Sequence, residues 1–428
     1  MLDINLVREN PELIKKNQIR AGKDVKEVNK LLDLDKKWRE KKQEVDNLRA
    51  KRNKISEEIN QAKKIKDEKK AKELIKEAQS IPEKIKKAEE EAGNLKEYSN
   101  KILNSLPNII SKKTPKGKDA SDNTEIKKFG KIPKFAFQIK NHVELCEALE
   151  IADFDESAKT SGNGFYYLKN ELAILNQALI RFAIDYMKKK KYIYIETPII
   201  IKKEILTTSE GNESFANSIY EIKDSDLALI GTAEHTLMAM HKNHVFNEKE
   251  LPKKYFSYSM CFRKEIGSHG INEKGLWRTH QFNKVEQFIF CLPEQSEKLY
   301  EELLKNSEGI LKELKLPYRV VEICTGDLAK WKHRSADLEV WRATTKSYGE
   351  VMSLSNITDY QARDHNIKVV RKKGERQVVH TLNNTALATS RIMVAILENN
   401  QQKDGSIKIP KALWKYTGYQ KILSVTPH

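Results

Sequence analysis

The stretch between residues 261 and 287 holds the side chains best suited to chemistry in this chain of 428 residues. Two arginines, two carboxylates and an aromatic ring occur there: Arg263, Glu265, Arg278, Phe282 and Glu286. Their spacing places several of them on one face of extended strands, and glycines within 267–275 indicate a long, mobile loop between two antiparallel strands. Such a face suits an anionic, planar ligand that carries an amine. A solvated hairpin with ordinary surface charges is the alternative.

Further polar groups accompany other predicted strands. Thr232-Ala233-Glu234 directly follows an apolar strand and opens a helix, so it either caps that helix or binds an amine or hydroxyl. Glu350 and Ser353 lie three positions apart on another strand, and Thr385 and Arg391 lie where a last strand passes into a helix. Capping alone explains the first group as well as binding does.

The elements that must position these groups are strands and helices after residue 136. Apolar runs and periodicity predict strands over 192–198, 318–323, 336–341 and 348–356, besides those around 227–230, 261–287 and 379–384. Helices are expected over 143–151, 172–187 and 294–314, and the stretch 379–391 joins a strand to a helix that continues to Leu397. Residues 136–428 therefore predict an α+β domain, an antiparallel β-sheet flanked by helices. No GxxxxGK[ST] or GxGxxG sequence occurs, which argues against a P-loop or Rossmann nucleotide site.

Residues 1–110 predict a different kind of unit. Apolar residues recur at alternating steps of three and four in two stripes, from Leu31 to Ala62 and from Leu74 to Ile102. We expect an antiparallel two-helix coiled-coil arm with its tip near Lys66–Lys70; a helix of about 36 residues is roughly 54 Å long. Pro82 should kink the second helix or mark its late start.

The charge of the chain indicates a polyanionic partner. Lys and Arg number 78 against 61 Asp and Glu, a formal net charge of +17, which favours nucleic acid. Basic residues of the arm, among them Arg49, Arg52 and Lys54, are candidates for phosphate contacts. A charged coiled-coil exterior, a dimer strut, or a composition suited to high temperature explains the same charges.

Segment 111–135, rich in Pro, Gly, Ser and Lys, is the expected linker between the two parts. The four cysteines form no CxxC pair, so a disulfide scaffold or zinc site is not expected and a reducing compartment fits. No apolar run reaches membrane-spanning length, and the N-terminus lacks the pattern of a secretory signal. A cytoplasmic protein without a membrane partner is expected.

Several stretches together resemble the motifs of class II aminoacyl-tRNA synthetases, in the form of the seryl enzymes. Phe262-Arg-Lys-Glu-Ile-Gly with Phe282-Asn-Lys-Val-Glu-Gln is similar to motif 2, and Thr232-Ala-Glu to the serine-binding loop. Glu350-Val-Met-Ser, with Gln361-Ala-Arg, resembles the metal-binding strand, and Thr385-Ala-Leu-Ala-Thr-Ser-Arg resembles motif 3.

The remainder of the chain resembles the same family. Helix 172–187 with the strand ending at Pro198 is similar to motif 1, the dimerisation element, and Met1-Leu-Asp-Ile with the helical hairpin is similar to the tRNA-binding arm. The resemblance implies a homodimeric ligase that activates L-serine with ATP and transfers the seryl group to the 3′ end of tRNA(Ser), and of tRNA(Sec) where present.

The resemblance also implies roles for individual residues. Catalytic roles fall to Arg263, Glu265 and Arg391. The implied serine-binding residues are Thr232, Ala233, Glu234, Arg263, Glu286 and Thr385. The implied ATP-binding residues are Arg263, Lys264, Glu265, Arg278, Thr279, Phe282, Glu350, Val351, Met352, Ser353 and Arg391. Glu350 and Ser353 would face a Mg²⁺ that bridges phosphates, and Arg49, Arg52 and Lys54 would contact tRNA.

Five positions depart from the family pattern without removing a charged catalytic group: Gly231, His235, Trp277, Thr279 and Asn384. The scattered cysteines also argue against the zinc-dependent variant of the family. Three alternatives stay open: a carrier-protein ligase of the same fold, which would lack the arm; a non-catalytic RNA-binding paralogue, which would have lost the charged residues; and activation of another small amino acid.

Overall fold

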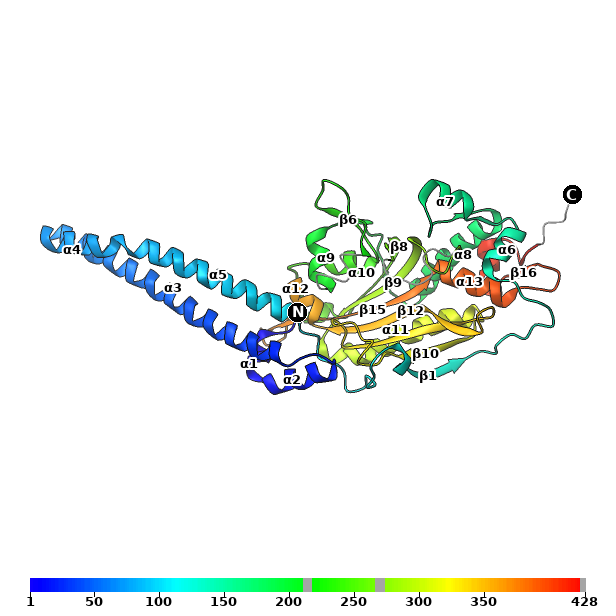
Figure 1. The fold of residues 1–428 in the computed structure, drawn as a ribbon, viewed down its shortest axis with the longest axis horizontal. Helices are drawn as coiled ribbons and strands as arrows, with labels where there is room; N and C mark the ends of the chain where they lie inside the picture. The colour runs from blue at the N-terminus through cyan, green and yellow to red at the C-terminus, as the bar shows by residue number, and fades with distance from the viewer. Residues whose placement is uncertain (211–217, 266–273, 424–428) are drawn as a thin grey trace. The chain divides into compact units, whose positions relative to one another are not determined.

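The computed structural model describes residues 1–210, 218–265 and 274–423. The chain divides into two compact units, Met1–Pro107 and Asn108–His428. Figure 1 shows both units as a ribbon coloured from the N-terminus to the C-terminus. The predicted class, a helical arm plus an antiparallel sheet with helices, is confirmed.

The first unit is entirely helical in the structure. Its helices are α1 (Ile4–Glu9), α2 (Pro11–Arg20), α3 (Lys26–Lys64), α4 (Glu68–Gln79) and α5 (Ile81–Ser105). The turn between α3 and α4 lies where the apolar stripe is interrupted, and the Asp67 side chain caps α4 by accepting a hydrogen bond from Lys70 N at 3.0 Å. Pro82 lies in the first turn of α5, so the second half of the hairpin is two helices, as its position predicts.

Buried isoleucines form the seam of this helical hairpin. Ile55 of α3 packs in one cluster with Ile81 and Ile85 of α5. At the base, Arg8 of α1 pairs with the buried Asp35 of α3, with 2.7 Å between Nη2 and Oδ1. The apolar spacing of three and four residues thus forms the contact surface it predicts.

The second unit is built on one eight-stranded sheet. Its strands, in spatial order, are β1 (Thr124–Phe129), β10 (Tyr318–Glu322), β11 (Arg334–Arg342), β12 (Ser347–Thr358), β15 (His380–Ala388), β9 (Gln281–Cys291), β8 (Lys253–Phe262) and β4 (Ile193–Tyr194). Every pair is antiparallel except β4 with β8. Part of the segment expected as a linker is therefore an edge strand, because β1 pairs with β10. Its residues are all exposed, so no alternation of apolar residues marks the strand.

Short sheets and helices complete this unit. The helices are α6 (His142–Ala148), α7 (Asp155–Ser161), α8 (Asn170–Lys189), α9 (Lys203–Glu210), α10 (Ala233–Ala239), α11 (Ser296–Glu313), α12 (Tyr360–Asp364), α13 (Thr389–Asn400) and α14 (Trp414–Thr417), with 3-10 turns at Ala120–Asp122, Glu248–Glu250, Pro293–Gln295 and Lys411–Leu413. The smaller sheets join β14 (Arg376–Val378), β13 (Lys368–Val370) and β7 (Val245–Asn247); β5 (Ile200–Lys202) and β6 (Leu227–Leu229); β2 (Ala152–Asp153) and β3 (Tyr167–Leu168); and β16 (Ile407–Lys408) and β17 (Lys421–Ile422).

One face of the large sheet carries the core. Helices α8, α11 and α13 pack on its strands, and a single cluster of buried apolar side chains joins them to it. On this face Gln287 of β9 donates to Ser307 of α11 at 3.1 Å. On the opposite face of β9, Phe282, Lys284 and Glu286 line a cavity, and Phe288 packs in a second apolar cluster with α10.

The hairpin at 261–287 differs in extent from the expectation. Strand β8 ends at Phe262 and β9 begins at Gln281, so Arg263, Glu265 and Arg278 follow or precede the strands instead of lying on them. The predicted mobile loop falls largely on 266–273, outside the described residues. Within the described part of the chain, no helix is long and apolar enough to cross a membrane.

Candidate active site

A cavity of about 490 Å³ opens on the face of the large sheet that the core helices leave free. This size is typical of sites for small molecules. Most of the side chains proposed from the sequence line it: Thr232, Glu234, Arg263, Glu265, Arg278, Thr279, Phe282, Glu286, Glu350, Val351, Met352, Ser353, Thr385 and Arg391. Ala233 is buried within α10, and Lys264 does not line the cavity either.

Arg263 is held at the end of β8 with its guanidinium group in the cavity. Arg263 N donates a hydrogen bond to His280 O at 2.9 Å, and the imidazole Nδ1 of His280 lies 2.9 Å from Arg263 O. Arg263 Nε donates to Gly231 O at 3.2 Å, and the guanidinium lies 5.4 Å from the centre of the Phe282 ring. The two terminal nitrogens form no hydrogen bond to a described residue, so the fork is free to bind an anion.

Glu265 and Arg278 approach each other across the base of the loop. Arg278 Nη1 and Glu265 Oε2 are 3.5 Å apart, and Glu265 has a φ of +49°, in the left-handed region. The two segments that leave β8 and enter β9 therefore remain paired by side chains after the strand pairing has ended. Both side chains line the cavity.

Thr232 both caps a helix and lines the cavity, the two roles that its position in the sequence allows. Its hydroxyl caps α10 by accepting a hydrogen bond from Glu234 N at 3.2 Å, and it also lines the cavity. The same oxygen accepts a hydrogen bond of 2.7 Å from Lys284 Nζ. Lys284 forms a buried ion pair of 2.6 Å with Glu286 Oε2, so one ammonium group fixes a hydroxyl and a carboxylate.

Asn383 of β15 joins the two carboxylates at this end of the cavity. Its Nδ2 donates to Glu234 Oε2 at 2.7 Å and lies 3.4 Å from Glu286 Oε1. Gln361 holds the other oxygen of Glu234 at 2.8 Å. Asn383 Oδ1 is buried and has no hydrogen-bond partner among the described residues. A buried acceptor without a donor is costly, so this end suits a ligand that brings amine or hydroxyl hydrogens.

Glu350 of β12 and Arg391 of α13 form the other end. Arg391 Nη1 donates to the backbone oxygen of Glu350 at 2.7 Å and lies 3.2 Å from its Oε2. Desolvation raises the pKa of the Glu350 carboxyl, but the charge and hydrogen bond of Arg391 outweigh it and hold the pKa below its usual value. Burial and the nearby charge of Glu350 raise the pKa of Asp337 on β11 to about 7.

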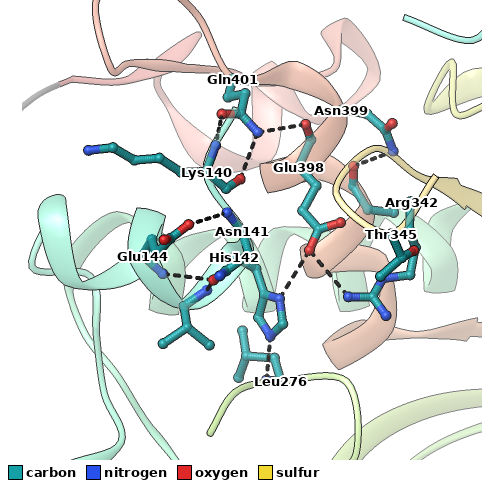
Figure 2. Close-up of polar contacts among 12 residues, drawn as sticks. Lys140, Asn141, His142, Glu144, Leu276, Arg342, Thr345, Glu398, Asn399 and Gln401 are labelled. Carbon is teal, nitrogen blue, oxygen red and sulfur yellow. Dashed lines mark hydrogen bonds and ion pairs between the residues drawn. The ribbon is translucent and has the colours of Figure 1, made fainter. Parts of the chain in front are cut away.

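A polar network behind the cavity holds the segment that leads into β9 (Figure 2). His142 Nε2 accepts a hydrogen bond from Leu276 N at 3.1 Å, and His142 Nδ1 lies 3.1 Å from Glu398 Oε1. Arg342 lies 3.3 Å from the same carboxylate oxygen, and its guanidinium stacks 4.2 Å from the centre of the Trp277 ring.

Two glycines make room for this network. A Cβ on Gly275 would lie 2.3 Å from His142 Nε2, and a Cβ on Gly349 would lie 2.4 Å from Trp277 Cζ2. Gly275 also has a φ of +139°, which side chains rarely adopt. Trp277 can therefore present its backbone oxygen to Arg391 Nε at 3.2 Å. The Trp277 ring, which departs from the family pattern, thus lies between the guanidinium groups of Arg342 and Arg391.

Sequence reasoning missed several cavity residues: Ser218, Lys284, Trp331, Lys332, Ser355, Asn383, Ala388 and Ser390, together with Trp277, which was noted only as a departure. Strand alternation could have found two of them. Lys284 shares its face with Phe282 and Glu286, and Asn383 shares its face with Thr385. Trp331 and Lys332 lie between β10 and β11, where no periodicity indicates a direction.

The basic residues proposed for tRNA lie exposed on α3. Arg49 pairs with Glu89 of α5 at 2.8 Å, Arg52 Nη2 donates to Asn53 Oδ1 at 3.2 Å, and Lys54 is exposed. Among the described residues no group of three or more His, Cys, Asp and Glu side chains could hold a metal ion.

Two family models match the chain. The model of the seryl-tRNA synthetase N-terminal domain matches residues 1–110. The model of the class II tRNA synthetase core domain for G, H, P, S and T matches residues 219–400.

Similar proteins match over their full length. A serine–tRNA ligase of Pyrococcus horikoshii is 44% identical over 99% of this chain and 98% of that protein, and one of Dictyoglomus turgidum is 45% identical over 99% of both. The crystal structure of seryl-tRNA synthetase from P. horikoshii complexed with ATP superposes with a TM-score of 0.93 at 43% identity, covering 100% of both chains. That of the cytoplasmic serine–tRNA ligase of Naegleria fowleri, in complex with AMP, gives 0.88 at 32% identity, covering 100% of this chain and 99% of that one.

Proposed function

Because the chain belongs to the seryl-tRNA synthetases, a family of class II aminoacyl-tRNA synthetases, we propose that the cavity on its sheet binds L-serine beside ATP and that its first unit binds tRNA(Ser). The activity is that of a serine–tRNA ligase. The assignment of the site rests on one observation: most of the residues expected to bind serine and most of those expected to bind ATP line the same cavity.

The reaction has two steps. The serine carboxylate attacks the α-phosphorus of ATP, the bond to the β-phosphate oxygen breaks, and seryl-adenylate and pyrophosphate form. A ribose hydroxyl at the 3′ end of the tRNA then attacks the acyl carbon and releases AMP. No protein nucleophile is needed, so the side chains act by positioning the reactants and stabilising charge.

Serine binds at the end formed by Thr232, Glu234, Glu286, Asn383 and Thr385. The two carboxylates attract its ammonium group, and the buried Asn383 Oδ1 offers an acceptor that has no hydrogen-bond partner among the described residues. Lys284 neutralises one of the two carboxylates. This end of the cavity therefore keeps about one negative charge, which the single ammonium group of serine balances.

ATP binds from Arg263 toward the end formed by Glu350 and Arg391. The free fork of Arg263 suits a bidentate contact that bridges the serine carboxylate and the α-phosphate. Phe282, under that guanidinium, stacks on adenine, while Glu265 contacts its edge and Arg278 holds phosphates.

Mg²⁺ fits the residues at this end. Mg²⁺ often takes one or two carboxylates and completes its shell with water and substrate phosphates, so one carboxylate at Glu350 with the Ser353 hydroxyl is sufficient. When bound, the ion would neutralise phosphate charge and act as a Lewis acid. Arg391, which already holds Glu350, orients that carboxylate.

The arm binds the tRNA away from the anticodon. Serine tRNAs do not share one anticodon, so an element that contacts another part of the tRNA is needed. An exposed basic surface on α3 suits backbone contacts with double-stranded RNA. Arg52 and Lys54 are better candidates than Arg49, which is paired with Glu89.

We further propose a cytoplasmic homodimer that forms through the motif 1 region. Exposed isoleucines lie on and beside its elements: Ile174 on α8, Ile193 on the edge strand β4, and Ile199 with Ile200 at β5. Apolar side chains gathered beside an open sheet edge favour association. Sedimentation equilibrium should give twice the chain mass of 49.5 kDa, and Ile193→Lys should shift it toward the monomer.

Amino-acid-dependent ATP–pyrophosphate exchange tests the function. Each of the twenty amino acids is supplied with and without tRNA, and serine alone should support rapid exchange in both cases. Exchange with another amino acid instead of serine would overturn the assignment of the cavity.

A further inference from the structure

Lys332 is a cation in the cavity to which no role in the reaction has been given. It lies between β10 and β11 and lines the cavity together with Trp331. The backbone around it is fixed: Asn108 N donates to Lys330 O at 2.7 Å, Asn108 Nδ2 donates to Trp331 O at 2.9 Å, and His333 N donates to Asn356 O at 2.8 Å. The Lys332 side chain thus extends from a segment whose backbone is hydrogen-bonded on both sides of this residue.

Two hydroxyl groups direct the ammonium group. Ser335 Oγ donates its own hydrogen to Leu354 O at 2.8 Å, and therefore accepts from Lys332 Nζ at 3.2 Å. Ser353 Oγ lies 3.5 Å from the same nitrogen. Lys332 is consequently placed over the cavity face of β11 and β12, beside the serine that we assign to the Mg²⁺ side of the site.

The charge of Lys332 is not paired. It forms no ion pair with any described residue, although its positive charge acts to lower the pKa of the Glu350 and Asp337 carboxyls. By contrast, the other lysine of the cavity, Lys284, is bonded to both Glu286 and Thr232. A half-buried, unpaired ammonium group in a cavity favours an anionic ligand.

We propose that Lys332 is a catalytic residue that binds the phosphate chain of ATP and the pyrophosphate that leaves it. The inference rests on the proposed function of the cavity. Of the ligands in the first step, serine and ATP, the polyphosphate alone carries several negative charges, and a lysine is a compact point charge suited to it. The serine carboxylate is the less suitable partner, because the serine end lies on α10, β9 and β15 whereas Lys332 lies over β11 and β12.

The test measures binding of ATP and of adenosine by titration calorimetry in EDTA, with no amino acid present. Lys332→Met should weaken ATP binding about tenfold or more, the effect of losing a hydrogen bond to a charged group, and leave adenosine binding unchanged. Lys332→Arg should restore most of the ATP affinity. Lys298→Met is the matched control, because Lys298 is an exposed lysine of α11 outside the cavity, and it should bind ATP as the unaltered protein does.

Steady-state exchange gives the second measurement. In Lys332→Met the KM for ATP should rise while the KM for serine changes less than about twofold. Unchanged ATP affinity, or an equal loss for ATP and adenosine, would overturn the assignment of Lys332. Failure of the proposed function looks different, since the unaltered protein would then show no serine-dependent exchange at all.

Discussion

Glu398 of α13 and His142 of α6 are joined by a contact of 3.1 Å between Oε1 and Nδ1, and both side chains are buried. Because His142 Nε2 accepts from Leu276 N, the Nδ1 nitrogen carries the hydrogen that Glu398 accepts. Desolvation raises the pKa of Glu398, but the His142 hydrogen bond and the charge of Arg342 outweigh it and leave the pKa below its usual value. An ionised carboxylate thus holds the imidazole that fixes the entry into β9.

Glu398→Ala should destabilise the protein and weaken ATP binding. The substitution leaves the Arg342 guanidinium without its carboxylate, at a cost of about 3–5 kcal/mol, measurable by urea denaturation. The KM for ATP should rise more than that for serine, because Leu276 precedes Trp277 and Arg278. Glu294→Ala removes the exposed pair with Arg371 and should cost at most about 1 kcal/mol. Equal losses in the two variants would contradict a special role for Glu398.

Arg263→Ala should reduce serine-dependent exchange by about a hundredfold or more, the usual effect of removing one group that stabilises the transition state. Arg263→Lys should restore little, because an ammonium group cannot make the bidentate contact. Circular dichroism and thermal unfolding check that each variant is folded. A folded Arg263→Ala protein with near-normal exchange would show that motif 2 has been assigned wrongly.

The serine pocket should reject alanine more strongly than threonine. A site whose buried polar groups bond a substrate hydroxyl loses those bonds with alanine, which corresponds to a ratio of about 10⁴ in kcat/KM, whereas excluding one methyl group gives about 10–200. Exchange rates with the three amino acids measure both ratios. If alanine were used nearly as well as serine, the hydroxyl would not be what Thr385 and its neighbours recognise.

Deleting residues 30–100 should leave exchange and abolish charging of tRNA(Ser). The deletion falls within the unit Met1–Pro107, and the cavity lies in the other unit. Both reactions are measured on the same preparation, with its folding checked by thermal unfolding. Loss of exchange in a folded deletion protein would contradict the separation of roles.

Arg52→Ala with Lys54→Ala should weaken tRNA binding and make it less sensitive to salt. The slope of log K against log salt should fall by about 0.7–0.9 for each phosphate that the protein no longer neutralises. Arg49→Ala should have less effect, since this residue is already paired with Glu89. Filter binding at several salt concentrations measures both. An unchanged slope in the double variant would place the tRNA on another surface.

Much of the cavity lining could be predicted from short stretches of sequence, since Thr232 and Glu286 belong to runs that resemble motifs of the family, and both line the cavity. The ends of the strands were less predictable. Arg263 looks like a strand residue, yet β8 stops at Phe262, although Arg263 N still donates a hydrogen bond to His280 O at 2.9 Å.

Other parts depend on contacts distant in sequence. Lys332 is directed by Ser335 and Ser353, and no local pattern shows that these three residues meet. Strand β1 has six exposed residues and no alternation, so only its pairing with β10 identifies it. Gly275 and Gly349 have their reason in the rings of His142 and Trp277, which lie far away along the chain.

The place of β15 between β12 and β9 has a consequence for synthesis on the ribosome. β15 is the last of the sheet's strands to be made, yet it lies in the middle of the order. Until β15 has been made, the native pairing available to the other strands is confined to two separate groups, β1-β10-β11-β12 and β9-β8-β4, and each group leaves an unpaired edge. Asn383, Thr385 and Arg391 arrive with the missing strand and its helix. The lining of the cavity is therefore incomplete until β15 has closed the sheet.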